Sequence, residues 1–238
     1  MNTVITQTGF KVGGLTSLTT IDFPGRLAAI IFVRGCPWRC RYCHNGSLLN
    51  AEGRGLPWDE VFGFLKSRVK LLDGVVFSGG EPTFWNDLPF YVQLTRQLGY
   101  EVAIHTNGAY PERLERLLAE AKISWVAMDI KAPFNEYAKV CGAEADGGKA
   151  RESAEIIVRS GVPYEFRTTI HPAILSVADV LVIARYLNHL KAEHFTLQRC
   201  QMENVLDPSL RDEGGDFEPY LRELQREFAR VFPRAEFR

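Results

Sequence analysis

The sequence predicts an α/β fold in which helices cover a parallel β-sheet. Two patterns carry this prediction: short apolar runs rich in valine, isoleucine and phenylalanine recur along the chain, and segments with helical spacing lie between them. Such alternation is typical of parallel sheets with helical crossovers. Six strand–helix units are too few for a complete eight-fold barrel, so a partial barrel and a doubly wound sheet both remain open.

Each predicted element has a local signal. The apolar runs that predict strands cover residues 27–33, 74–77, 101–106, 125–130, 164–170 and 194–197. The first helix follows Pro57, a residue suited to a first turn, and its apolar spacing continues to Leu72. The other helices cover residues 87–98, 111–121, 149–160, 176–189 and 217–231. Gly161 can end the fourth helix with a left-handed cap, and Ser176 can cap the fifth.

Length and charge narrow the class of protein. A chain of 238 residues can bury one sizeable core, so we expect a single domain over residues 1–238, with an N-terminal extension (about 1–25) and a closing helix (about 216–232). The 28 basic and 29 acidic side chains nearly balance, which argues against a nucleic-acid-binding protein driven by overall charge. The longest apolar run, 27–33, is far shorter than the ~20 residues that span a bilayer. With no secretory signal recognised, we expect a soluble, cytoplasmic protein without membrane partners.

Three of the five cysteines lie within eight residues, at Cys36, Cys40 and Cys43. This odd number and this crowding fit a metal or reactive site in a reducing compartment better than a disulfide framework. No second ligand pair follows, as structural zinc would need. The pattern favours an iron–sulfur cluster with one iron open to an outside ligand, while zinc or a non-metal role stays an alternative. We interpret the isolated Cys141 and Cys200 as packing residues.

Polar and glycine clusters follow the predicted strands, at the edge where parallel sheets place their sites. A Ser-Gly-Gly-Glu-Pro motif at 78–82 follows the second strand, and Thr-Asn-Gly at 106–108 follows the third. The two glycines allow close approach to a ligand, and Glu81 can receive an ammonium group. An ordinary tight turn is the alternative interpretation of this motif.

Charged residues also occur inside the later strands. Asp129 and Lys131 are two residues apart and therefore share one face of a strand. Buried charges are costly unless they are paired or bound, so the two form an internal ion pair or bind a zwitterion. In the second case Lys131 meets a carboxylate and Asp129 meets an ammonium group or a cation. Arg167 either pairs with Glu165 or reaches another acidic ligand group.

Together these motifs resemble those of the radical S-adenosylmethionine (SAM) enzymes. The resemblance rests on the CxxxCxxC triad with Tyr42 before its last cysteine, on the Gly-Gly-Glu-Pro turn and on the polar residues late in the strands. Within that superfamily the sequence is similar to the activating enzymes of glycyl-radical proteins, and specifically to the activating proteins of anaerobic ribonucleoside-triphosphate reductase. The motifs that carry this similarity are at residues 20–25, 42–45, 77–83, 105–108 and 128–131.

The resemblance implies a single radical SAM domain with a partial (β/α)6 barrel. It also implies that a 4Fe–4S cluster is bound by Cys36, Cys40 and Cys43, and that the open iron takes the amino nitrogen and carboxylate of SAM. The residues that it places around SAM are Gly79, Gly80 and Glu81 at the amino group, Asp129 and Lys131 at the carboxylate end, Tyr42 at the adenine, and Thr106, Asn107 and Arg167 at other polar parts.

The implied reaction is reductive cleavage of SAM to methionine and a 5′-deoxyadenosyl radical, which abstracts hydrogen from a glycine of a partner enzyme. The implied partner is the anaerobic ribonucleotide reductase, and a flavodoxin- or ferredoxin-type protein is the implied electron donor. Two alternatives are kept. One is a radical SAM enzyme acting on a small molecule, similar to 7-carboxy-7-deazaguanine synthase, and the other is a zinc-stabilised binding protein.

Two departures from the activating-enzyme pattern matter. His105 stands where such enzymes often carry aspartate, which puts a monovalent cation near His105 and Asp129 in doubt. No cysteine-rich module is inserted between Cys43 and Gly79, so we expect no auxiliary clusters. The charged, glycine-containing segment 203–216 is interpreted as a solvated connector, with a docking element as the alternative.

Overall fold

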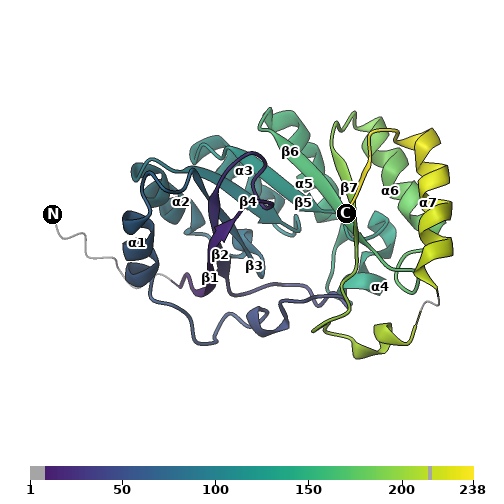
Figure 1. Cartoon of the computed structure of the whole chain (residues 1–238), viewed down its shortest axis with the longest axis horizontal. Coiled ribbons are helices and arrows are strands. Elements are labelled where there is room, and N and C mark those ends of the chain that lie inside the picture. The colour runs from purple at the N-terminus through teal and green to yellow at the C-terminus, as the bar shows by residue number, and fades with distance from the viewer. Residues whose placement is uncertain (1–8, 214–215) are drawn as a thin grey trace.

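The computed structural model describes residues 9–213 and 216–238 (Figure 1). Eight strands form one sheet, and their order in space is their order in the sequence. The strands that pair in parallel through its centre are β2 (Ala28–Val33), β3 (Gly74–Gly79), β4 (Glu101–Thr106), β5 (Trp125–Asp129), β6 (Tyr164–Ile170) and β7 (Phe195–Arg199). Because the strand order never reverses, the sheet is not doubly wound. The predicted α/β fold with six parallel strands is confirmed.

Two further strands extend the sheet at its edges. β1 (Val12–Thr19) pairs antiparallel with β2, and the two-residue β8 (Glu236–Phe237) pairs with β7. β1 lies in the segment assigned to an N-terminal extension, of which residues 1–8 are outside the described part of the chain. Its Gly-, Ser- and Thr-rich sequence is only partly buried. It therefore lacks the apolar run that marks the central strands.

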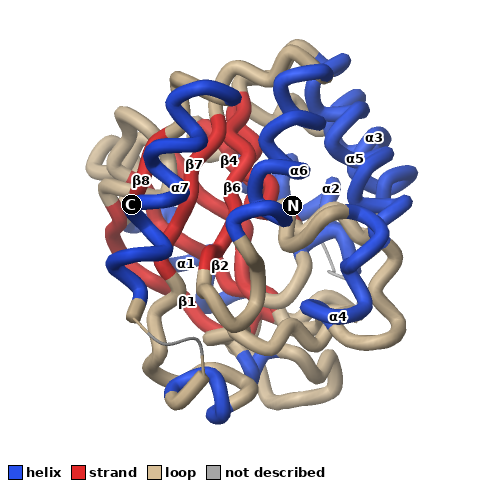
Figure 2. Tube along the Cα trace, turned by 90° about the vertical axis from the view of Figure 1, so that its right-hand side faces the viewer, coloured by secondary structure: helices blue, strands red, loops and turns tan. Residues whose placement is uncertain are grey.

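Helices connect the parallel strands and cover the outside of the curved sheet (Figure 2). They are α1 (Trp58–Ser67), α2 (Leu88–Gln97), α3 (Pro111–Glu120), α4 (Tyr137–Cys141), α5 (Gly147–Ser160), α6 (Val177–His189) and α7 (Phe217–Val231). Local signals set several ends: Ser176 and Asp179 form a capping box at α6, and Gly161 ends α5 at a φ of 71°. The short α4 was not predicted.

The first helix is shorter than its apolar spacing predicts. It ends at Ser67 instead of continuing to Leu72, because Lys70 adopts a φ of 70°. That left-handed conformation is incompatible with a continuing right-handed helix. Leu72 instead forms an isolated bridge with Val69.

The alternation of side chains along the strands separates two faces. The outer face forms the main core with the helices and includes Ile31, Phe77 and Ile104, all almost fully buried. The inner face starts with the small cluster around Phe23 and Ile30. Nearer the carboxyl ends of the strands the inner positions become polar, so the inner face ends in a polar opening. Among the residues that the structure describes, no helix is long and apolar enough to cross a membrane.

Candidate active site

A cavity of about 390 Å³ opens at the carboxyl ends of the parallel strands. It collects side chains from the loop after β2, the turn after β3 and the ends of β4, β5 and β6. The predicted site residues that line it are Cys36, Cys40, Tyr42, Cys43, Gly79, Gly80, Thr106, Asn107, Asp129, Lys131 and Arg167. Every residue of the predicted site except Glu81 therefore faces one cavity.

Backbone hydrogen bonds fix the cysteine loop on two sides. On one side, Gly35 and Cys36 donate their N–H groups to the carbonyls of Leu48 and Leu49, at 2.8 and 3.2 Å. On the other side, the loop runs along α4, where the N–H of Arg39 donates to the carbonyl of Cys141 at 2.8 Å. The loop is thus held open across the cavity without a helix or strand of its own.

The three thiols of this loop are free, and each is largely removed from water. Burial raises the pKa of Cys36 to about 12 and also raises the pKa of Cys43. Cys40 differs, because a hydrogen bond from Cys141 lowers its pKa although burial opposes the shift. Desolvated thiols of this kind bind metal strongly once deprotonated, since the metal supplies the missing positive charge.

The arrangement of the thiols bears on the kind of metal centre. Within residues 9–213 and 216–238, no three His, Cys, Asp or Glu side chains surround one point that could hold a single metal ion. An iron–sulfur cluster makes a different demand, because each cysteine binds its own iron and the sulfurs stay apart. Three free thiols lining one cavity are compatible with such a cluster.

The glycine turn after β3 packs against the backbone that leads into the cysteine loop. Gly79 has a φ of 115°, and a Cβ there would lie 2.5 Å from backbone atoms of Val33. A Cβ on Gly80 would overlap the carbonyl oxygen of Gly35. The glycines are thus required for close contact between two backbone segments, and they also line the cavity.

Glu81 is not among the residues that line the cavity, and its contact with the amino group of SAM stays a prediction. Its side chain is fully buried and accepts hydrogen bonds from the N–H of Thr83 at 3.0 Å, the hydroxyl of Thr106 at 2.7 Å and the N–H of Asn107 at 2.7 Å. Burial raises its pKa, and these hydrogen bonds oppose that shift. The carboxylate therefore ties the turn after β3 to the end of β4.

Asp129 is the centre of a charge cluster on the inner face. Arg167 donates from Nε to its Oδ1 at 2.9 Å, and Lys131 donates from Nζ to its Oδ2 at 3.4 Å. Burial alone would raise the pKa of Asp129, but the two cations outweigh it and hold the pKa at about 2. Arg167 thus pairs with Asp129 and not with Glu165, which contacts Arg238 instead. Two cations share one carboxylate, so the cluster presents excess positive charge to an anionic ligand.

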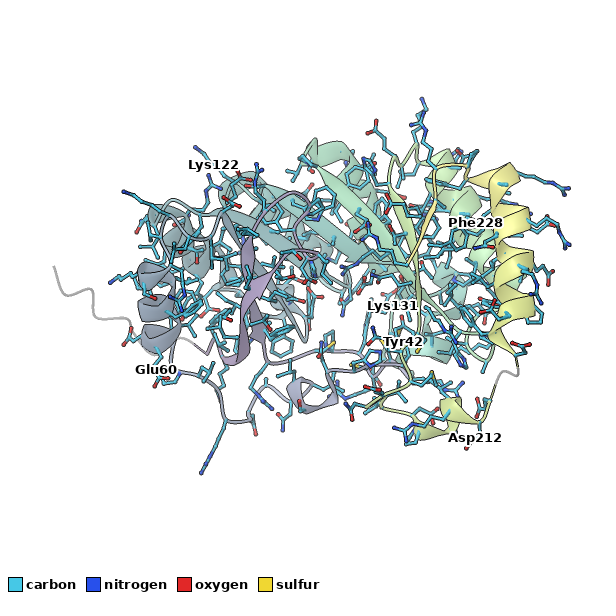
Figure 3. The ribbon with its side chains drawn as sticks, viewed as in Figure 1. Tyr42, Glu60, Lys122, Lys131, Asp212 and Phe228 are labelled. Atoms are coloured by element: carbon cyan, nitrogen blue, oxygen red, sulfur yellow. The ribbon has the colours of Figure 1, made fainter. Side chains whose placement is uncertain are left out.

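Tyr42 lies beside this cluster. Figure 3 shows its side chain next to Lys131, whose Nζ is 5.5 Å from the centre of the Tyr42 ring. The Tyr42 hydroxyl is buried and has no hydrogen-bond partner among the described residues. A buried polar atom of this kind is costly unless a ligand or water satisfies it, which fits a site that is completed by a polar cofactor.

Several cavity residues were not predicted from the sequence. They include Asp22, Thr169 and Gln198, and the cavity is also lined by His105, which the sequence analysis singled out without a role. The ring of His105 contacts the carbonyl oxygen of Asp22 through Nε2 at 2.9 Å, and burial together with the charge of Arg167 lowers its pKa to about 4. Thr169 and Gln198 are register partners on β6 and β7. Thr169 could have been found from the sequence, because it stands two residues after Arg167 and therefore lies on the same face of the strand.

A larger cavity of about 1080 Å³ adjoins the first. The two share Asp22, His44, Arg167, Thr169 and Gln198. The larger cavity continues outward to residues 199–203 and to the exposed side chain of Ile21. It therefore connects the charge cluster with the outside of the molecule.

Segment 203–213, interpreted from the sequence as a solvated connector, is mostly exposed but also contacts the cysteine loop; residues 214–215 lie outside the described part. Arg41 donates from Nε to Oδ2 of Asp207 at 2.7 Å and through a terminal nitrogen to Glu213 at 2.9 Å. The ring of His44 contacts the carbonyl oxygen of Glu203 at 2.9 Å. We call this segment the strap, because it fastens the loop that carries the three cysteines.

Comparison with known proteins agrees with this geometry. Residues 30–186 match the model of the radical SAM superfamily. A protein of Methanocaldococcus jannaschii named as a glycyl-radical enzyme activating enzyme is 30% identical over 218 residues, covering 90% of this chain and 89% of its own. The pyruvate formate-lyase-activating enzyme of Clostridium pasteurianum is 32% identical over 243 residues, covering 90% of this chain and 98% of its own.

A solved structure agrees at the level of the fold. SuiB of Streptococcus suis, in its complex with SAM, superposes with a TM-score of 0.65 at 17% identity and covers 85% of this chain. The present chain spans only 47% of that protein.

Fold, cysteine loop and charge cluster together define an α/β enzyme with a metal-dependent cofactor site. The chain belongs to the radical SAM superfamily, and within it to the glycyl-radical enzyme activating type. Its cofactors are a 4Fe–4S cluster and SAM. The free thiols, the excess positive charge and the unpaired Tyr42 hydroxyl fit both groups.

Proposed function

We propose that this enzyme generates a glycyl radical on an anaerobic ribonucleotide reductase, with Cys36, Cys40 and Cys43 holding the 4Fe–4S cluster. When bound, the cluster and SAM supply a one-electron cleavage that yields methionine and a 5′-deoxyadenosyl radical. A flavodoxin- or ferredoxin-type protein delivers the electron. The observation that supports the cofactor chemistry is that three free thiols and a cation-rich polar cluster line the same cavity. The choice of partner rests on the sequence motifs alone.

Different residues of the cavity bind different parts of SAM. Lys131 has two N–H groups left after its contact with Asp129, and these bind the carboxylate of SAM. Gly79 and Gly80 bring the backbone close to its amino group, and Tyr42 packs beside the adenine. Arg167 keeps Asp129 ionised and in place through the 2.9 Å hydrogen bond. The buried walls exclude water, which protects a reactive radical from side reactions.

The second cavity supports a protein as substrate. Its volume of about 1080 Å³ exceeds that of the cofactor cavity, about 390 Å³, and it leads from the surface to the shared residues Arg167 and Gln198. A glycine Cα can reach the cofactor only on an exposed loop that enters such an opening.

The function is tested with anaerobically reconstituted enzyme. After reduction with dithionite and addition of SAM, we expect 5′-deoxyadenosine, and with anaerobic ribonucleotide reductase we expect the glycyl radical signal in electron paramagnetic resonance (EPR). Cys40→Ala should lose the cluster while the chain stays folded, and Cys200→Ala, outside the cofactor cavity, is the matched control. If pyruvate formate-lyase but not the reductase acquires the radical, the choice of partner is wrong. Absence of 5′-deoxyadenosine from the wild type refutes the reaction itself.

A further inference from the structure

Asn107 makes a contact that its predicted role does not include. It directly follows β4, and its side-chain Nδ2 lies 3.5 Å from Sγ of Cys36, within hydrogen-bond distance for a sulfur acceptor. Only 5% of the residue is exposed. The family resemblance implies a contact of Asn107 with polar parts of SAM, and in the structure its amide faces a cysteine sulfur.

The orientation of the Asn107 amide is fixed by its other partners. Its Oδ1 accepts a hydrogen bond from the N–H of Ala109 at 2.9 Å. Since a carbonyl oxygen can accept that bond and an NH₂ group cannot, the NH₂ group must face Cys36. The donor toward the sulfur is therefore determined by a second, independent contact.

The position of Asn107 is fixed as well. Its backbone N–H donates to Oε2 of Glu81 at 2.7 Å, and the same carboxylate accepts the hydroxyl of the preceding Thr106. Glu81 is fully buried, so this link lies in a region of low dielectric constant, where such a bond is strong. The buried carboxylate thus holds the backbone from which Asn107 reaches Cys36.

We propose that Asn107 is a positioning residue for Cys36, and that its N–H···S hydrogen bond raises the reduction potential of the cluster. The inference rests on the proposed function, which makes Cys36 a cluster ligand. An added electron increases the negative charge on the ligand sulfurs, so a donor facing one of them favours the reduced form. Glu81 does not contact Cys36 in this scheme; it acts indirectly, by holding the backbone of Asn107 in place.

The first test measures the midpoint potential of the reconstituted enzyme without SAM. Asn107→Ala removes the donor, and Asn107→Asp removes it while keeping an acceptor for Ala109. Both should lower the equilibrium constant for reduction about tenfold, or about 59 mV for one electron. Asn45 is the matched control, because it lines the same cavity but donates to the carbonyl of Gly79 at 3.2 Å. Asn45→Asp adds the same charge and should shift the potential less.

The second test detects the hydrogen bond directly in the wild type and uses the Asn107 variant only to assign the nitrogen. Wild-type enzyme with ¹⁵N in the asparagine side-chain amides is reduced without SAM and studied by pulsed EPR. We expect a nitrogen coupled to the cluster through the hydrogen bond, retained in Asn45→Asp and lost in Asn107→Asp. No such coupling in the wild type, or an unchanged potential in Asn107→Ala, overturns the proposal. Full iron content in Cys36→Ala would instead refute the assignment of Cys36 in the proposed function.

Discussion

Arg167 on β6 and Asp129 on β5 are register partners, and their side chains form a hydrogen-bonded ion pair of 2.9 Å on the inner face of the sheet. Lys131 approaches the other carboxylate oxygen. The pair joins two neighbouring strands at the last residue of β5. It therefore stabilises the fold and shapes the cofactor site at once.

Because of this ion pair, we expect the free energy of unfolding to decrease at low pH. The pKa of Asp129 is held at about 2, below its ordinary 3.8, so its contribution is complete above about pH 4 and is lost as the pH falls through 2. The shift corresponds to about 2 kcal/mol. Asp129→Asn should therefore be less stable than the wild type at neutral pH, and the difference should narrow toward pH 2. Urea unfolding across this range measures it; a constant difference would contradict the assignment.

Lys131 should act on SAM and not on the cluster. We expect Lys131→Met to keep the aliphatic stem and the iron content but to weaken SAM binding about tenfold, since a charge-assisted hydrogen bond is lost. Equilibrium dialysis with labelled SAM measures the affinity. The control is Lys139→Met, at an exposed lysine of α4. Unchanged affinity in Lys131→Met would remove this residue from the site.

The central fold was predictable because its strands are buried on both faces and so appear as continuous apolar runs. The edge strand β1 was not, because Gly13, Gly14 and several hydroxyl residues leave it without an apolar run. β8 has two residues, too few for any periodic signal. The short α4 depends on its packing against the cysteine loop, through contacts such as that of Arg39 with Cys141. Such tertiary contacts leave no pattern in the sequence.

Cavity residues were predictable where a charged side chain stands at the end of an apolar run, as for Asp129 and Lys131. The hydrogen bonds of Glu81 were not predictable, because its partners Thr106 and Asn107 come close only when β3 and β4 pair. Until that pairing is known, a glutamate in a glycine turn looks free to bind a ligand. Gln198 was missed because a neutral side chain in a strand gives no sign of a site. It lines the cavity only because the alternation of side chains along β7 turns it toward the inner face.

The glycines of the turn after β3 should not tolerate a side chain. Because a Cβ on Gly80 would overlap the backbone oxygen of Gly35, Gly80→Ala should destabilise the fold by about 3 kcal/mol or more. Gly63, inside α1, has open space around it, and Gly63→Ala should stabilise the protein by about 0.5–1 kcal/mol. Urea unfolding of the two variants tests both signs. Equal stabilities would show that the backbone contact is unimportant.

The strap should protect the cluster more than it stabilises the fold. Its ion pairs with Arg41 are partly exposed, so Arg41→Gln should cost less than about 1 kcal/mol of folding free energy. The freed cysteine loop should nevertheless release iron faster to a chelator, followed by the loss of cluster absorbance. Arg211→Gln is the control, because Arg211 donates to the carbonyl of Met202, the residue before the strap, and not to the cysteine loop. Equal release from both variants would show that the strap does not fasten the loop.

His105 should make the protein acid-sensitive in a different range. Burial and the charge of Arg167 lower its pKa from 6.5 to about 4, so the unfolded chain binds a proton in this interval and the folded chain does not. Stability therefore falls as the pH drops from 6.5 to 4, by about 3 kcal/mol. His105→Gln should flatten the dependence of the free energy of unfolding on pH in this interval. Urea unfolding at several pH values tests this, with His189→Gln, at an exposed histidine, as the control. If His105→Gln and the wild type lose the same stability, the neutral imidazole is not the acid-sensitive group.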